Sequence, residues 1–108
     1  MAGQNLNSTS IVGRRMRERR EGMGLAQEKV GVAIGIDESS SRARISRYEL
    51  GVHEPPLPTA RLIAQALDVP LAYLYCDDDK VAELLLDLHK MTTGKRERTL
   101  SYFLAQFN

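Results

Sequence analysis

Three arginines crowd one short stretch of the sequence, RARISRYELG, at positions 42, 44 and 47. An arginine guanidinium donates hydrogen bonds from a planar fork, which suits a phosphate group or the edge of a guanine base. Ile45 and Tyr48 lie three residues apart, so in a helix they share one face and can anchor the segment to a core. Several of the polar side chains must then point away from that core. The stretch is therefore a candidate surface for binding an anion.

Charge is distributed unevenly along the 108 residues, although the net charge is only +1. Residues 14–47 carry nine basic and five acidic side chains, and residues 48–90 carry three basic and eight acidic ones. The last segment, residues 91–108, has three basic side chains and one acidic side chain. A basic N-terminal half beside an acidic middle predicts an anionic partner for one face of the protein.

Helical signals punctuate the chain, and no segment shows the alternation typical of a strand. Ser10 can cap a first helix, Gly35 and Gly51 can end the second and third, and prolines at 58 and 70 suit helix starts. We expect five short helices, at about 11–21, 27–34, a third ending at 51, 59–67 and 71–75. Two amphipathic helices are expected next, at about 79–91 and after Gly94. The predicted fold class is all-α.

The two C-terminal helices carry apolar stripes at helical spacing. The stripes are Val81, Leu84, Leu85 and Leu88 in the first helix, and Leu100, Phe103, Leu104 and Phe107 in the second. They either complete the domain core or pair with a second subunit, and the sequence leaves both possibilities open. We divide the chain into a disordered lead-in (1–10), a domain of five helices (11–76) and a C-terminal helical extension that is a candidate for dimerisation (77–108).

The segment from Gln27 to Tyr48 has the features of two helices that meet at a sharp angle. Gly31 supplies the small residue needed where the backbones approach, and Gly35 supplies the turn. The inward apolar residues are Val30, Ile34, Ile45 and Tyr48. With these residues inward, the second helix presents its polar side chains outward, as a recognition helix does in the DNA major groove.

The sequence resembles the Cro/phage-repressor (Xre-like) helix-turn-helix family from Ile11 to Tyr75. The resemblance is carried by VGRRMRERREGMGLAQEKVGVAIGI, ISRYELGVHEPP and TARLIAQALDVPLAYLY. It implies a five-helix repressor-like domain that binds double-stranded DNA, here with additional C-terminal amphipathic helices. The DNA-binding residues that it implies are Gln27, Ser41, Arg42, Ala43, Arg44, Ser46 and Arg47. It also implies a structural ion pair between Arg20 and Glu49.

Two features depart from the family pattern. Ala26 stands where a capping Ser or Thr is usual, a loss of about 1 kcal/mol. The segment IDESSSRAR is about four residues longer than the usual connection, which is close to one helical turn of about 3.6 residues. The residues of this insertion, Ile36–Ser41, extend either the recognition helix or the turn. We favour the longer helix, capped by Asp37 or by one of Ser39 to Ser41.

The remaining residues give no case for an enzyme, a metal site or a cofactor. Cys76, His53 and His89 lack zinc-ligand spacing, and Asp77 to Asp79 lack the ligand pattern of a calcium loop. In the run RRMRERR, arginines 14, 15 and 17 are candidates for phosphate contacts. The single cysteine is compatible with a reducing compartment, and we expect a cytoplasmic protein of bacterial or phage origin, with no membrane segment.

These observations predict a repressor-like transcriptional regulator that binds a palindromic operator as a homodimer. One alternative is an autorepressor of the antitoxin type, which binds a toxin through its C-terminal helices. Another alternative is a protein-interaction module on the same fold. The basic residues of the first and third helices argue against the last of these.

Overall fold

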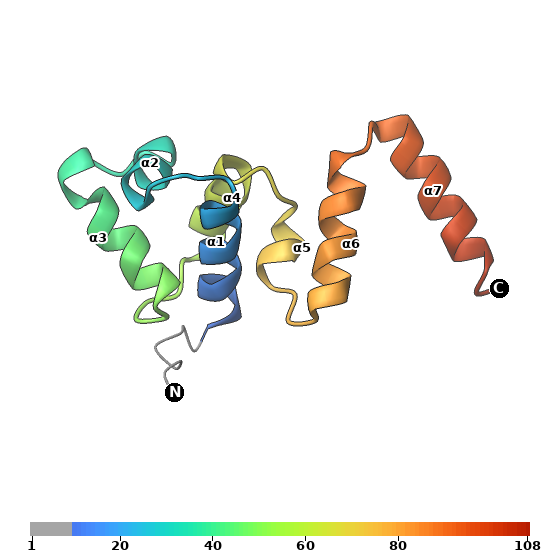
Figure 1. Cartoon of the computed structure of the whole chain (residues 1–108), viewed down its shortest axis with the longest axis horizontal. Helices are drawn as coiled ribbons and strands as arrows, with labels where there is room; N and C mark the ends of the chain where they lie inside the picture. The colour runs from blue at the N-terminus through green and yellow to red at the C-terminus, as the bar shows by residue number, and fades with distance from the viewer. Residues whose placement is uncertain (1–9) are drawn as a thin grey trace.

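A computed structural model describes residues 10–108, which are entirely helical apart from turns and connections (Figure 1). The helices are α1 (Ile11–Gly22), α2 (Gln27–Ala33), α3 (Glu38–Glu49), α4 (Leu57–Ala66), α5 (Leu71–Leu74), α6 (Asp79–Lys90) and α7 (Thr93–Ala105). The all-α prediction is therefore confirmed. Helix α3 lies at one end of the long axis and α7 at the other (Figure 1). The lead-in expected over residues 1–10 lies outside the described residues, except for Ser10. The Ser10 hydroxyl caps α1 by accepting from the Gly13 amide at 3.0 Å.

Helices α1 to α5 enclose the apolar core. Its buried members include Val12, Met16, Val30, Ile45, Tyr48, Ile63, Ala64, Leu67, Val69, Tyr73 and Leu74. Ile45 and Tyr48 are buried, as their spacing predicts, so α3 is held by one face and leaves the other in solvent. Full burial of an aliphatic or aromatic side chain stabilises a fold by about 1.5–3 kcal/mol. These two anchors therefore fix which face of α3 is outward.

The close approach of α2 and α3 occurs at Gly31. A Cβ atom at this position would overlap the Ser41 side chain and would lie 3.0 Å from the Ser41 Cα. The Ser41 hydroxyl donates to the Glu28 carbonyl at 2.7 Å, which adds a directional contact between the two helices. The predicted need for a small residue at position 31 is confirmed. Gly35 adopts a φ of +95°, which suits the turn between the helices.

The insertion before Ile45 lengthens α3 rather than the turn. The helix begins at Glu38, and the Asp37 carboxylate caps it by accepting from the Ser39 amide at 3.1 Å and from the Ser39 hydroxyl. These two hydrogen bonds lower the pKa of Asp37, with the bond from the hydroxyl as the larger cause. Ala26 makes no side-chain cap at the start of α2, as its identity predicts.

Some helix boundaries differ from those expected. Helix α4 begins at Leu57 and includes Pro58 in its first turn, where a missing amide proton is tolerated. Helix α7 begins at Thr93, because the Thr92 hydroxyl accepts from the Lys95 amide. Gly94 therefore lies inside the first turn of α7 and does not precede the helix. No helix among residues 10–108 is long and apolar enough to cross a membrane.

The two C-terminal helices contribute little to the core. Helix α6 buries Ala82 and packs Leu86 against the core, whereas Val81 and Leu84 of the expected stripe stay exposed. Helix α7 buries no residue. Of the two possibilities for these stripes, completion of the core is therefore wrong for α7 and for the outer face of α6.

We predict that Gly31→Ala destabilises the protein, although alanine normally favours a helix interior. The added methyl group must displace Ser41 and α3, and overpacking of this kind costs about 1–3 kcal/mol. Urea unfolding followed by circular dichroism measures the free energy of unfolding. The matched control is Gly22→Ala, because a Cβ atom there meets nothing within 4 Å. Equal stability of both variants would contradict the assigned role of Gly31.

Candidate nucleic-acid interface

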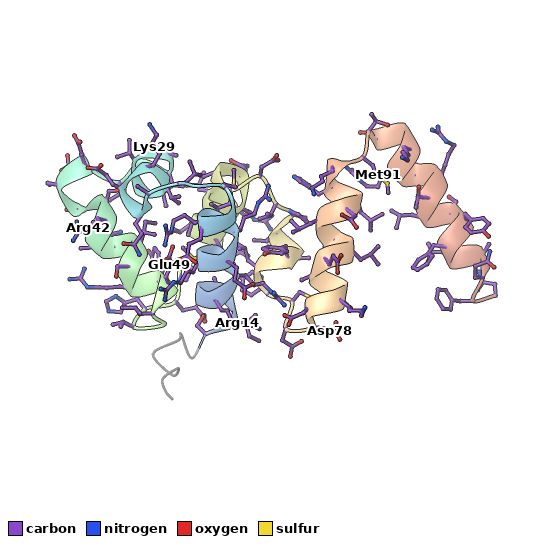
Figure 2. All side chains as sticks on the ribbon, viewed as in Figure 1. Arg14, Lys29, Arg42, Glu49, Asp78 and Met91 are labelled. Carbon is purple, nitrogen blue, oxygen red and sulfur yellow. The ribbon has the colours of Figure 1, made fainter. Side chains whose placement is uncertain are left out.

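The outer face of α3 presents an arginine-rich surface. Successive residues of a helix are rotated by about 100°, so the direction opposite the buried side chains of α3 is centred near Ala43. Arg42, Arg44 and Arg47 are exposed around that centre, and Ser46 is half-buried. Figure 2 shows Arg42 on the outer side of α3, away from the other helices. The structure thus brings five of the seven predicted DNA-binding residues together on one accessible helix.

Ser41 is the exception among the predicted contacts on α3. Its side chain has no solvent exposure and donates to the Glu28 carbonyl. A buried hydroxyl that is already paired cannot reach a base edge. Its role is to join α2 to α3, and we remove it from the candidate interface. The longer helix explains the difference, because the extra turn places Ser41 over Gly31.

A buried ion pair joins α1 to α3. Arg20 donates to Glu49 from Nε at 2.6 Å and from Nη2 at 3.0 Å, which is a bidentate contact. Glu49 is 3% exposed and lies between α3 and α1 (Figure 2). Arg20 also donates to the Leu25 carbonyl at 2.8 Å. The predicted pairing of Arg20 with Glu49 is thus present in the structure.

Gln27 completes this contact from the start of α2. Its side-chain nitrogen donates to Glu49 Oε1 at 3.0 Å, so one carboxylate receives donors from two helices. The hydrogen bond to Glu49 is the largest cause that raises the pKa of Arg20, and it outweighs the effect of desolvation. The Arg20 guanidinium therefore remains charged at neutral pH. Because Glu49 lies at the C-terminal end of α3, where the helix dipole disfavours an acid, these donors offset an unfavourable position.

A cleft of about 600 Å³ lies beside the C-terminal half of α3. It is lined by Arg44, Arg47, Tyr48, Val52, His53 and Glu54. Two arginines and a histidine on its walls make it a place for an anionic group next to the outer face of α3. Val52 and His53 both donate their backbone amides to the Arg47 carbonyl, which holds the loop against the helix end.

The arginines of α1, which are candidates for phosphate contacts, have partners within the protein. Arg15 is buried, and its guanidinium is used within the molecule. Arg14 contacts Glu18 and Asp79, and Arg17 pairs with Glu21. The basic run is therefore largely neutralised by acids of the same chain. This role of Arg15 has no local sequence signal, because its partners Cys76 and Asp79 lie 61 and 64 residues further along the chain.

No group of three or more His, Cys, Asp or Glu side chains within residues 10–108 is arranged to hold a metal ion. Within the same residues, every buried side-chain nitrogen or oxygen has a hydrogen-bond partner. Between residues 42 and 47 of α3, the charged groups that face solvent are the guanidinium groups of three arginines. This arrangement suits binding to an anionic surface.

We predict that Glu49→Ala lowers the free energy of unfolding by about 3 kcal/mol, because it leaves Arg20 partly buried and uncompensated. The double variant Arg20→Met/Glu49→Leu should regain much of this loss, since paired apolar side chains can replace a buried ion pair. A double-mutant cycle of Arg20→Met, Glu49→Leu and the double variant, followed by urea unfolding, measures the coupling between the two residues. A loss below about 0.5 kcal/mol for Glu49→Ala would show that the pair is not structural.

Comparisons with known proteins agree with this geometry. An uncharacterized HTH-type transcriptional regulator of Sinorhizobium medicae (strain WSM419) is 35% identical over 66 residues, which are 61% of this chain and 45% of that relative. A regulator of Rhizobium meliloti (strain 1021), described in the same words, matches with the same identity and coverage. The chain thus spans less than half the length of these relatives. Among solved structures, the transcriptional regulator BswR is similar, with a TM-score of 0.79 at 37% identity. That match covers 87% of this chain and 92% of BswR.

A family model described as helix-turn-helix (HTH_3) matches residues 16–74, which is more than half of the chain. The matched range contains the whole of α2, α3, α4 and α5 and the larger part of α1. It therefore includes the Gly31 crossing, the Arg20–Glu49 pair and the outer face of α3. The protein belongs to the helix-turn-helix family, in its Cro/phage-repressor (Xre-like) branch.

Proposed function

We propose that the protein is a sequence-specific DNA-binding transcriptional regulator that lays α3 in the major groove and binds a palindromic operator as a homodimer. The observation that carries the proposal is the outer face of α3, where three exposed arginines surround Ala43 on a helix anchored by Ile45 and Tyr48. Family membership supports it, because the helix-turn-helix domain places its second helix in the groove.

Each residue of the proposed interface has a physical role. Ala43 at the centre is small enough for the helix to approach base edges, and its methyl group suits contact with a thymine methyl. Arg42 and Arg44 flank it and can bond guanine bidentately, while Arg47 extends along the same face toward the backbone. Ser46 is half-buried at the rim, and its hydroxyl can bond either a base or a phosphate.

Gln27 is the proposed contact from α2. Its side-chain nitrogen donates one hydrogen to Glu49, which leaves a second N–H on the same amide. Helix N-termini also suit phosphate oxygens because their backbone amides lack partners within the helix. The contact between Gln27 and Glu49 would orient the amide before DNA arrives. In this proposal Gln27 positions the protein on the phosphate backbone of the DNA, whereas the α3 arginines recognise bases.

The extra first turn of α3 adds selectivity at the tip of the helix. Glu38 and Ser40 are exposed there, and the Asp37 carboxylate is occupied by Ser39. A carboxylate is repelled by phosphates but accepts a hydrogen bond from the amino group of cytosine. The acidic tip therefore opposes non-specific binding and favours sequences that place such a donor opposite it.

The proposed dimer uses the uncovered apolar faces of α6 and α7. Phe103 and Leu104 of α7 are 47% and 60% exposed, and Phe107, two residues past the end of that helix, is 76% exposed. The rings of Phe103 and Phe107 contact each other edge to face at a centroid distance of 5.9 Å. On α6, Val81 and Leu84 are also exposed. Exposed apolar side chains grouped in this way mark an interaction site.

Charge complementarity favours a second copy of this chain as the occupant. Helix α6 and the two residues before it carry five acids and two bases, whereas α7 carries three bases and one acid. In an isologous dimer, α7 of each copy can lie against α6 of the other, so that opposite charges meet around the apolar contact. Because α7 and α3 lie at opposite ends of the molecule, this arrangement leaves both α3 helices uncovered (Figure 1).

We predict that Arg44→Ala and Arg47→Ala each weaken binding to DNA selected from a random library. Loss of one phosphate contact should reduce the slope of log affinity against log salt by about 0.9, whereas loss of a base contact should relax the selected sequence at one position. Fluorescence anisotropy at several salt concentrations measures both effects. Arg61→Ala, at an exposed arginine of α4, is the control. Unchanged affinity of both α3 variants, or no enriched sequence for the wild type, would contradict the proposal.

We predict that Phe103→Glu converts the dimer to a monomer, because it places a charge in the apolar interface. The loss of the dimer should in turn reduce the affinity for DNA. Sedimentation equilibrium measures the mass of each variant. Tyr102→Glu is the matched control, since it also replaces an aromatic side chain with a carboxylate, but on the opposite side of α7. A monomeric wild type would overturn the homodimer and would assign the α7 surface to a different protein, as in the antitoxin alternative.

A further inference from the structure

The N-terminal end of α6 is held to α1 by a buried arginine. Arg15 is 3% exposed, and its Nε donates to the Cys76 carbonyl at 2.7 Å. Its Nη2 donates to the Asp79 carboxylate at 3.0 Å, and its guanidinium lies over the ring of Tyr73 at 5.6 Å from the centroid. Asp79 is the first residue of α6. One side chain from α1 therefore contacts both the loop before α6 and the start of that helix.

The charges at this contact support each other. Burial alone lowers the pKa of Arg15, but the hydrogen bond with Asp79 and the charge of Glu18 raise it above its ordinary value. Hydrogen bonds from Arg15 and then Arg14 lower the pKa of Asp79. The Asp79 side chain is largely exposed, and Arg15 keeps the Cys76 carbonyl and Glu18 as partners without it, so removal of the Asp79 carboxylate loosens α6 without leaving the guanidinium unpaired.

A second polar contact holds the C-terminal end of α6. His89 Nε2 lies 3.0 Å from Asp68 Oδ1, in the turn between α4 and α5. Arg19 of α1 donates to the Leu67 carbonyl of the same turn at 2.8 Å and to the Asp68 carbonyl at 3.3 Å. Arg15 and Arg19 are four residues apart and thus neighbours on α1. The two ends of α6 are therefore tied, directly or through one turn, to one side of α1.

The same helix holds α3 through Arg20. Helix α1 therefore connects the proposed DNA-reading helix with the helix that carries part of the proposed dimer face. Ala82 and Leu86 pack between the two polar ends of α6 and fill the space against the core. Directional contacts at both ends with packing between them fix the tilt of α6 as well as its position.

We infer that the contacts of Asp79 with Arg15 and of His89 with Asp68 set the separation between the two α3 helices of the dimer, and so determine which half-site spacing the protein accepts. This inference rests on the proposed homodimer. Half-sites on one face of DNA are about 34 Å apart, and each added base pair also rotates the second half-site by about 34°. A rigid α6 cannot follow that rotation, whereas an α6 held only by its apolar middle can. Asp79 and His89 are thus positioning residues, which need not touch DNA.

The test compares the wild type with Asp79→Ala/His89→Ala. Both residues are at the surface or half-buried, so the double variant retains the apolar core. The probes are duplexes that carry the sequence selected by the wild type, with the half-site separation unchanged or altered by one or two base pairs. A single half-site duplex is included. Asp87→Ala is the control, because it removes an exposed acid from the same helix.

We expect the wild type to lose more than about tenfold in affinity when the spacing changes by one base pair, comparable to a mismatched base pair. The double variant should lose less than about threefold across the series, while its half-site affinity stays unchanged; the assay is made at a concentration where sedimentation equilibrium shows both proteins as dimers. The control should follow the wild type. A double variant with the same spacing profile as a dimeric wild type would overturn this inference alone. A wild type that is monomeric, or that selects no palindrome, would instead overturn the proposed function, and the inference would fall with it.

Discussion

The bidentate contact between Arg20 and Glu49 is the interaction on which the DNA-reading part of the molecule depends. It joins two helices through residues that are 29 positions apart along the chain, and Gln27 of α2 donates to the same carboxylate. Apolar packing by Ile45 and Tyr48 holds α3 against the core but is not directional. A planar fork on a carboxylate fixes one register, because both hydrogen bonds must be satisfied together. The position of the α3 arginines along the helix axis follows from that register.

Much of this arrangement could be predicted from residue spacing. Glycine at position 31 predicts a close helix crossing, and the four-residue insertion keeps Ile45 inward because it adds about one helical turn. Both features depend on the local sequence and on helix geometry, and the structure confirms both. The apolar residues of α1 to α5 also follow from their periodicity. A local pattern determines which face of a helix is apolar, and in a small domain that face packs against the single core.

The roles of Ser41 and Arg15 could not be predicted in the same way. Each carries a polar side chain that looks available for nucleic acid, yet each is buried by a partner from elsewhere in the chain. Ser41 meets α2 because the added turn shifts the start of α3, and Arg15 meets the α5–α6 loop 61 residues later. A polar residue within a basic run gives no sign of whether a distant acid will neutralise it. The balance between surface and buried arginines is a property of the tertiary fold.

These contacts change the interpretation of α1. Its basic run is a candidate surface for phosphates in the sequence, but in the structure its arginines contact two separate sets of partners within the protein. Arg20 holds α3 on one side, and Arg15 with Arg19 holds the elements around α6 on the other. A helix that donates hydrogen bonds in both directions transmits position better than one packed only by apolar contacts, because hydrogen bonds depend on angle as well as distance. In the proposed dimer, which must match two half-sites, the relative placement of the two α3 helices matters as much as the residues they carry. In that proposal the charge of α1 serves the geometry of recognition.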